Sequence, residues 1–155
     1  MNTYNIVLVH PEIPQNTGNI GRLCVSTSTR LHLIEPLGYS LDDKYLKRSG
    51  MDYWKHLDLV IYKNWEEFKE KNPEANMYFL STKTKKSFWE CPYEDNCFLI
   101  FGSEGAGLPA EFYNIYKEQL YTLPMNGKFH RSLNLANSVA VALFEGLRRN
   151  QAKGG

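Results

Sequence analysis

The chain has 155 residues, of which 43% are hydrophobic and 23% are charged, and its formal net charge is +1. A chain of this length buries about two thirds of its unfolded surface in one core, so we expect a single domain over residues 1–155 with a disordered tail at 151–155. The near-neutral charge excludes a general attraction to nucleic acid, and the short apolar runs and missing signal segment predict a cytoplasmic protein with no membrane partner.

The first half of the chain alternates between predicted strands and helices. Residues 4–10 are rich in Ile, Val and Leu, which is typical of a central strand covered on both faces of a parallel sheet. After a Pro-bracketed loop, a helix reaches about Ser28, with Thr17 or Asn19 as its N-cap. The other elements expected here are a strand at 31–34, a helix at 41–49 and an extended segment at 57–62.

The second half continues this alternation. A helix at 65–71 ends before Pro73, and a long helix at 135–150 closes the chain. The elements expected between them are strands at 77–81 and 97–101, a helix at 109–116 and a strand at 119–123. The whole pattern predicts an α/β fold, in which a mostly parallel sheet is flanked by helices.

The three cysteines, Cys24, Cys91 and Cys97, are odd in number and lack CxxC spacing. No His cluster accompanies them in the sequence. This usage argues against a disulfide framework and against a zinc site. We expect reduced, mostly buried thiols and no metal.

Three separated segments join a Gly- or Pro-bent loop to a helix: residues 11–22, 101–109 and 123–137. Bends at the carboxyl ends of parallel strands expose backbone N–H and C=O groups to polar ligands. Each segment alone is also typical of a simple turn or a capped helix. The middle one lacks the glycine spacing of dinucleotide-binding and Walker motifs. Together they predict one composite pocket.

Several polar side chains in these segments suit a ligand. The Asn16 amide both donates and accepts, and the Arg22 guanidinium has five donors suited to phosphate, although a solvated arginine fits the same position. Ser132 fits equally well as the plain N-cap of the last helix. His130 is the one histidine that we place near a ligand.

Basic residues form local groups in spite of the small net charge. Taken singly, each group is also typical of solvated surface charge. The groups are Lys44, Lys47 and Arg48; Lys83, Lys85 and Lys86; Lys128, His130 and Arg131; and Arg148, Arg149 and Lys153.

In this order and at these positions, the three segments resemble the signature motifs of the SPOUT superfamily of RNA methyltransferases, in its SpoU branch, which methylates ribose 2′-hydroxyls. The resemblance covers nearly the whole chain. The small size and the stretches 11–20 and 33–38, with Asp42-Asp43-Lys44 and Asp52-Tyr53, resemble the small tRNA enzymes of this branch that act on cytidine or modified uridine at wobble position 34. Action on rRNA or another tRNA position remains open, as does a non-catalytic RNA- or nucleotide-binding module.

The resemblance implies a C-terminal deep trefoil knot that holds S-adenosylmethionine as methyl donor. It also implies a homodimer with a composite active site, and the anticodon region of tRNA as partner. The implied reaction-centre residues are Asn16, Arg22, Ser132 and Asn134. Because a guanidinium is not deprotonated in proteins, we expect Arg22 to bind phosphate and the developing alkoxide, while Glu104, a phosphate oxygen or water takes the proton. The implied cofactor contacts are Leu80, Ser81, Thr82, Gly102, Glu104, Gly105, Leu123, Met125, Ser132 and Leu133.

Overall fold

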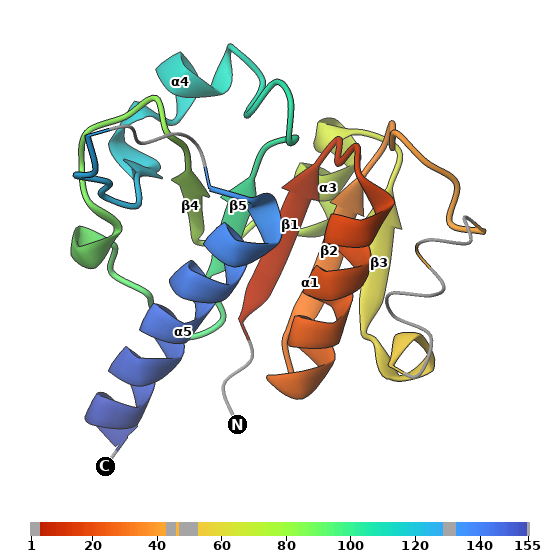
Figure 1. The fold of residues 1–155 in the computed structure, drawn as a ribbon, viewed down its shortest axis with the longest axis horizontal. Helices are drawn as coiled ribbons and strands as arrows, with labels where there is room; N and C mark the ends of the chain where they lie inside the picture. The colour runs from red at the N-terminus through yellow and green to blue at the C-terminus, as the bar shows by residue number, and fades with distance from the viewer. Residues whose placement is uncertain (1–3, 43–45, 47–52, 129–132, 155) are drawn as a thin grey trace.

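The computed structural model describes residues 4–42, 46, 53–128 and 133–154, with only the backbone of 152–154. Its six strands pair in parallel throughout, in the order β3-β2-β1-β5-β4-β6 (Figure 1). The strands are β1 (Asn5–Val9), β2 (Arg30–Ile34), β3 (Leu59–Tyr62), β4 (Met77–Leu80), β5 (Phe98–Phe101) and β6 (Leu120–Tyr121). The predicted α/β class with a parallel sheet is confirmed.

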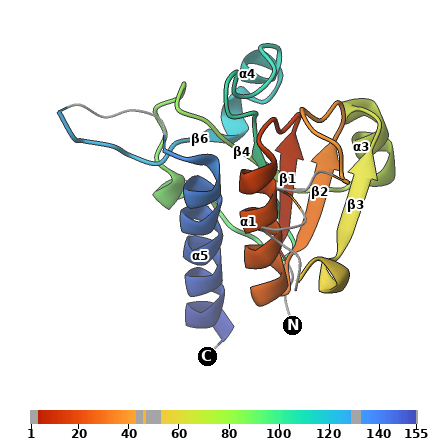
Figure 2. The same cartoon turned by 45° about the vertical axis from the view of Figure 1, so that its right-hand side comes forward.

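Helices cover both faces of this sheet. The helices are α1 (Pro14–Ser26), α3 (Trp65–Lys71), α4 (Phe112–Ile115) and α5 (Leu135–Gly154), with short 3-10 turns η1 (Trp54–His56), η2 (Phe88–Glu90) and η3 (Lys117–Gln119). Helices α1 and α5 lie side by side on one face, and α3 lies on the other (Figures 1 and 2).

The core has two apolar layers that share strand β1. Ile6 and Leu8 belong to the cluster beneath α1 and α5, whereas Val7 and Val9 belong to the cluster beneath α3 and α4. Neighbouring side chains of a strand point to opposite faces, and both faces of β1 are covered. All five of its residues are therefore buried. The expectation of a central strand covered on both sides is confirmed.

Helix α1 begins earlier than its polar residues predict. Its N-cap is Ile13, which makes no side-chain capping bond, and Pro14 is the first helical residue. Proline suits this place because its fixed φ is helical and it has no N–H to leave unpaired. Thr17 and Asn19 therefore lie inside the helix, and the expectation that either caps it is wrong.

In the second half of the chain, the observed bounds of three elements differ most from the predicted ones. Helix α4 is confined to Phe112–Ile115 and β6 to Leu120–Tyr121, shorter than predicted. Helix α5 runs on to Gly154, beyond the predicted end at residue 150. Within this helix, the Glu145 carboxylate pairs with Arg148 and Arg149 one turn further on. The helix expected at 41–49 falls largely outside the described residues.

All three cysteines are free and buried, as expected. In the part of the chain that the structure describes, no helix is both long and apolar enough to cross a membrane. Because every strand is parallel, the carboxyl ends of all six lie along one edge of the sheet. The loops after β1, β4, β5 and β6 all leave from that edge, and they build the candidate site.

Candidate active site

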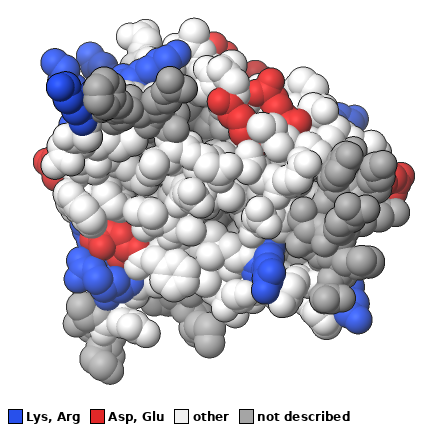
Figure 3. Space-filling model, viewed as in Figure 1, with Lys and Arg blue, Asp and Glu red and all other residues white. Residues whose placement is uncertain are grey.

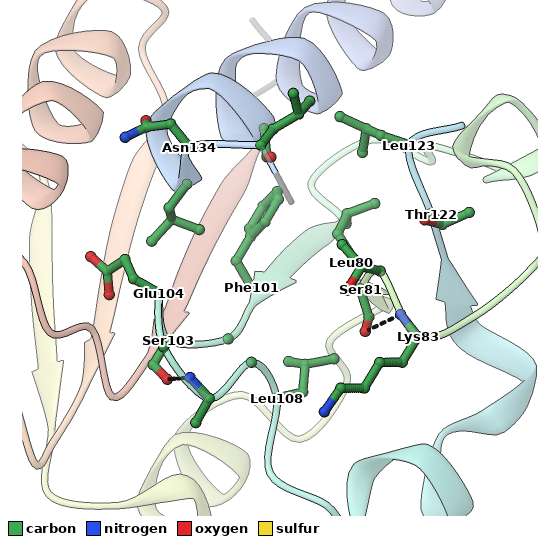
Figure 4. A pocket seen from close by; sticks show the side chains of 18 of the residues that line it. Leu80, Ser81, Lys83, Phe101, Ser103, Glu104, Leu108, Thr122, Leu123 and Asn134 are labelled. Carbon is green, nitrogen blue, oxygen red and sulfur yellow. Dashed lines mark hydrogen bonds between the residues drawn. The ribbon is translucent and has the colours of Figure 1, made fainter. Parts of the chain in front are cut away.

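A cavity of about 440 Å³ lies at the carboxyl ends of β4 and β5 (Figure 4). Its size is typical of a small-ligand pocket. Apolar side chains line much of it, with loop backbone and a few polar groups between them. The lining residues include Ile13, Leu80, Ser81, Thr82, Phe101, Gly102, Leu108, Leu123, Met125, Leu133 and Ser138.

The loop after β5 is a tight turn that requires glycine. The Ser103 N–H donates to the Gly107 carbonyl at 3.1 Å, and the Gly107 N–H donates back to Ser103 at 3.0 Å. A Cβ atom at Gly102 would lie 2.0 Å from the carbonyl carbon of Gly107 and 2.2 Å from the nitrogen of Leu108. Gly107 has a φ of +76°, in the left-handed region that favours glycine. The turn therefore presents its backbone to the cavity in one fixed shape.

Two glutamates bind the loops after β1 and β5 to each other. The Glu104 carboxylate accepts hydrogen bonds from the backbone N–H groups of Glu12, at 2.8 Å, and Ile13, at 3.0 Å. In return, the Glu12 carboxylate accepts from the Gly105 N–H at 2.7 Å. Charge-assisted bonds of this kind are stronger than neutral ones, and this pair locks the two loops reciprocally.

A chain of side-chain amides extends this lock to the start of α5. The Asn16 amide nitrogen donates to Glu104 at 3.1 Å, and the Asn16 carbonyl oxygen accepts from the Asn134 amide at 3.0 Å. Asn134 also caps α5, because its Oδ1 accepts from the Asn137 N–H at 3.3 Å. The three segments predicted to form one composite pocket thus converge around Asn16, which is buried.

The opposite wall of the cavity comes from the loops after β4 and β6. The Thr122 N–H donates to the Lys86 carbonyl at 2.8 Å, and the Phe88 N–H donates to the Thr122 carbonyl at 2.8 Å. The hydroxyls of Ser81 and Tyr113 lie 2.7 Å apart. These bonds join the two loops to each other and fix the wall against α4.

A family model described as the SpoU rRNA Methylase family matches residues 3–144. The chain belongs to this family. Its relatives include the tRNA (cytidine(34)-2′-O)-methyltransferase of Burkholderia ambifaria, which is 42% identical over 98% of this chain and 99% of its own. The enzyme of the same name from Methylovorus glucosotrophus is 43% identical, over 97% of this chain and 98% of its own.

Solved structures of SpoU-family proteins share the fold of the chain. One that concerns "the 2-OH methylation of C/U34 on tRNA" has a TM-score of 0.91 and 38% identity, and covers 97% of this chain and 98% of that one. The SpoU methyltransferase AviRb of Streptomyces viridochromogenes, solved with AdoMet, has a TM-score of 0.80, 19% identity and covers 97% of this chain and 62% of that one. The family that the motifs resemble is therefore confirmed.

The residues singled out from the SpoU motifs are distributed unevenly around the cavity. Every expected cofactor contact that the structure describes lines it: Leu80, Ser81, Thr82, Gly102, Glu104, Gly105, Leu123, Met125 and Leu133. Asn134 lines it too, and Asn16 contacts the lining residues Glu104 and Asn134. Ser132 and His130 lie outside the described residues.

Arg22 does not line the cavity of its own chain. It is exposed on α1, where its guanidinium lies 4.9 Å from the centre of the Tyr53 ring. Such a cation–π contact orients the guanidinium while leaving its donors available. Of the expected reaction-centre residues that the structure describes, Arg22 is the one placed apart from the others.

Sequence reasoning missed Glu12 and Tyr113. Glu12 lies within the first motif, but only its partner Gly105, far along the chain, reveals its role as a clamp. Tyr113 follows the second motif and holds Ser81 in the opposite wall. Neither residue has a local sequence signal, since each acts through a contact between distant loops.

Proposed function

We propose that this chain transfers a methyl group from S-adenosylmethionine to the ribose 2′-hydroxyl of nucleotide 34, the wobble position, in tRNA, where the nucleotide is cytidine or a modified uridine. The observation that carries the proposal is the nearly full-length match, at 42% and 43% identity, to enzymes named for methylation at this nucleotide. The cavity supports the proposal, because the cavity lies where the three motifs meet.

The cavity fits the cofactor by its chemistry. Leucine side chains and Phe101 offer apolar walls for a purine and for the carbon skeleton of the donor, while the loop after β5 supplies backbone donors and acceptors. The cofactor supplies a methyl group made electrophilic by its sulfonium. The residues that hold it are the cofactor contacts that the SpoU motifs imply: Leu80, Ser81, Thr82, Gly102, Glu104, Gly105, Leu123, Met125, Ser132 and Leu133. Among the residues described, no group of three or more His, Cys, Asp or Glu could hold a metal ion.

Asn16 and Asn134 orient the ribose in this proposal. Each amide is fixed by its neighbours, Asn16 by Glu104 and Asn134 by the first turn of α5, so neither needs to reorder when RNA binds. Ser132, close to Asn134 in sequence, completes the polar group at the reaction centre. Holding the 2′-oxygen in line with the methyl carbon contributes on the order of 7–11 kcal/mol in well-oriented model systems.

The proton of the 2′-hydroxyl needs an acceptor other than Arg22, whose guanidinium stays protonated. Glu104 is held by three donors that belong to Glu12, Ile13 and Asn16, which supports a positioning role for it. The proton therefore leaves to a phosphate oxygen or to water. Arg22 binds the phosphate and stabilises the developing alkoxide.

The active enzyme is a homodimer with a composite site in this proposal. The face formed by α1 and α5 shows few charged side chains (Figure 3), and on α5 Val141 and Phe144 are exposed by 45% and 54%. An exposed apolar face of this kind is typical of a protein interface. Arg22 lies on α1, away from its own cavity, and we assign it to the cavity of the partner subunit.

We propose one SPOUT domain over residues 1–155, with its C-terminal segment threaded as a deep trefoil knot. The course of the chain supports this topology. After β6, Thr122 bonds to Lys86 and Phe88 in the loop after β4, and the chain then returns to α5 beside α1. The described residues of the third motif, 123–128 and 133–137, thus lie at the carboxyl edge of β4 and β5, which precede them in the chain.

One experiment tests the reaction and its site together. The purified protein is incubated with S-adenosylmethionine and with total tRNA from a strain that lacks the gene, and new 2′-O-methyl groups are located by mass spectrometry. We expect methylation at position 34 of particular tRNAs. Methylation of rRNA or of another tRNA position would identify a sister activity, and RNA binding without affinity for the cofactor would leave only a binding module.

A further inference from the structure

The rim of the cavity is electrostatically divided. On one side, acidic side chains gather over the loops after β1 and β5, where Glu12 and Glu104 lie (Figure 3). On the other side, basic side chains gather over the loops after β4 and β6 (Figure 3). A polyanion that crosses the opening meets repulsion on the first side and attraction on the second.

The basic side of the rim comes from two loops that are bonded to each other. Lys83 and Lys85 belong to the loop after β4, and Lys128 ends the described part of the loop after β6; all three are exposed. Residues 81–88 and 120–128 contain no Asp or Glu. These two stretches therefore add no acidic side chain to the basic side of the rim.

Lys83 lies at the opening of the cavity. It lines both the cavity and the groove beside it, with its ammonium 5.9 Å from the centre of the Tyr113 ring. Figure 4 shows its side chain extending from the Ser81 end of the cavity toward Leu108. An ammonium here faces whatever enters the cavity from outside.

Lys86 has a different role, although it belongs to the same run of sequence. Its ammonium donates to the Glu118 carbonyl at 3.1 Å and lies 4.6 Å from the centre of the Tyr121 ring. These contacts tie the loop after β4 to the edge of the sheet. Lys86 thus anchors the loop that presents Lys83 and Lys85.

We propose that Lys83, Lys85 and Lys128 bind phosphate groups of the RNA substrate and hold its backbone on the β6 side of the cavity. The inference rests on the proposed function and adds the direction in which the substrate lies. A ribose that enters the cavity brings the phosphates on either side of it to the rim. Cations on one side and carboxylates on the other then allow one placement of that backbone.

The test is the salt dependence of tRNA binding by the full-length protein with Lys83, Lys85 and Lys128 all changed to Gln. Each phosphate contact contributes about one unit to the slope of log affinity against log salt. We expect the slope to fall by about two to three units and the affinity at low salt to fall by about 10-fold or more. A variant with Arg at the same three positions keeps the charge, so it retains both the slope and the affinity.

A matched control removes the same charge from the opposite edge of the sheet. The changes Arg30→Gln, Lys55→Gln and Lys71→Gln lie near the amino ends of the strands, and we expect wild-type slope and affinity from them. If the rim variant binds tRNA with the same slope as this control, the inference is wrong. Binding of S-adenosylmethionine by Lys85→Gln with Lys128→Gln stays as in the wild type, because neither residue lines the cavity.

The two proposals fail in different ways. If the wild type methylates a nucleotide other than 34, the proposed function fails, while the comparison of slopes still decides whether the rim binds phosphate. If the wild type methylates position 34 and the rim variant keeps its full slope, only the inference fails.

Discussion

Gly102 has no room for a side chain, because the backbone of its own loop fills the space. A Cβ atom there would approach Gly107 and Leu108 to within 2.0–2.3 Å, and backbone cannot yield as a flexible side chain does. We expect Gly102→Ala to lower the free energy of unfolding by about 1–3 kcal/mol and to weaken cofactor binding by about 10-fold. Thermal unfolding and titration calorimetry measure the two effects.

Gly127 provides the control for this substitution. Among the residues that the structure describes, no heavy atom lies within 4 Å of the Cβ position there, so we expect Gly127→Ala to change stability by less than about 0.5 kcal/mol. Equal effects of the two substitutions would contradict the role given to the turn after β5.

His32 makes stability depend on pH. It is buried in the sheet, where its ring nitrogens bond to Asn5 Oδ1 at 2.9 Å and to the Tyr62 hydroxyl at 2.8 Å. Burial, with a smaller contribution from Arg30, lowers the pKa of His32 from 6.5 to about 4. The unfolded chain therefore takes up the proton first, and the contribution of neutral His32 is full above pH 6.5 and is lost as the pH falls to about 4.

The loss amounts to on the order of 3 kcal/mol over that window. Urea unfolding of the wild type and of His32→Gln between pH 7 and pH 4 measures it, since glutamine is polar but does not titrate. We expect the stability advantage of the wild type to shrink steadily as the pH falls. An advantage that stays constant with pH would show that His32 does not titrate in this way.

At the scale of elements, Asn134 makes hydrogen bonds to two helices, α1 and α5. Its Oδ1 caps α5, and its amide nitrogen donates to Asn16 on α1. Asn134→Asp keeps the cap but loses the donor, whereas Asn134→Ala loses both. We expect the alanine variant to be less stable than the aspartate variant by about 1 kcal/mol. Both variants should methylate RNA at least about 10-fold more slowly, because Asn16 is left with an unpaired oxygen.

Denaturant unfolding and initial rates of methyl transfer separate these two effects. Wild-type activity in the aspartate variant would show that Asn134 acts only as a helix cap, and that the bond between α1 and α5 does not serve the reaction.

Helices with strong local signals were predictable from sequence. The predicted bounds of α3 are those observed, because Asn64 caps it, accepting from the Glu67 N–H at 2.8 Å, and Pro73 follows its end. In α1 the sequence offers two possible starts. The helix begins at Pro14 and not at Thr17 or Asn19, the polar residues within it. Strand β6 is short because one neighbour, β4, defines it, and local sequence cannot report how much of a segment finds a partner.

The candidate site was also predictable only in part: the sequence indicates its loops but not the contacts between them. Loops at the carboxyl ends of parallel strands must share one edge, so the motifs already indicated which loops form a cavity. The bonds between Glu12 and Gly105 and between Asn16 and Asn134 join residues far apart in the chain. No periodicity or spacing encodes such pairs. The position of Arg22 outside its own cavity likewise depends on the packing of α1, which the sequence motif does not contain.

At the scale of the whole molecule, the proposed homodimer depends on the face of α1 and α5. We expect Phe144→Glu to convert the proposed dimer to a monomer, because it places a charge on the exposed apolar face of α5. Light scattering after size-exclusion chromatography measures the mass. Ile115→Glu is the control: Ile115 is 60% exposed on α4, so a charge there should leave the dimer intact. A Phe144→Glu variant that remains dimeric would place the interface elsewhere.

The proposed composite site makes a prediction that only a dimer can meet. We expect Arg22→Ala and Asn134→Ala each to lower the activity of a homodimer by about 10-fold or more, since every cavity then lacks one of the two residues. A heterodimer of the two variants has one cavity with Asn134 intact and with Arg22 supplied by the other subunit. Its second cavity lacks both. We therefore expect the heterodimer to show about half the activity of the wild type, if α1 serves the neighbouring cavity.

Two different affinity tags, used in succession, isolate this heterodimer from the co-expressed variants, and methyl transfer to tRNA is measured per dimer. Doubly tagged wild-type dimer sets the full rate. If Arg22 served the cavity of its own chain, both cavities of the heterodimer would be defective and its activity would be no higher than that of the more active homodimer. That result would return Arg22 to its own subunit and remove the need for a partner in the reaction.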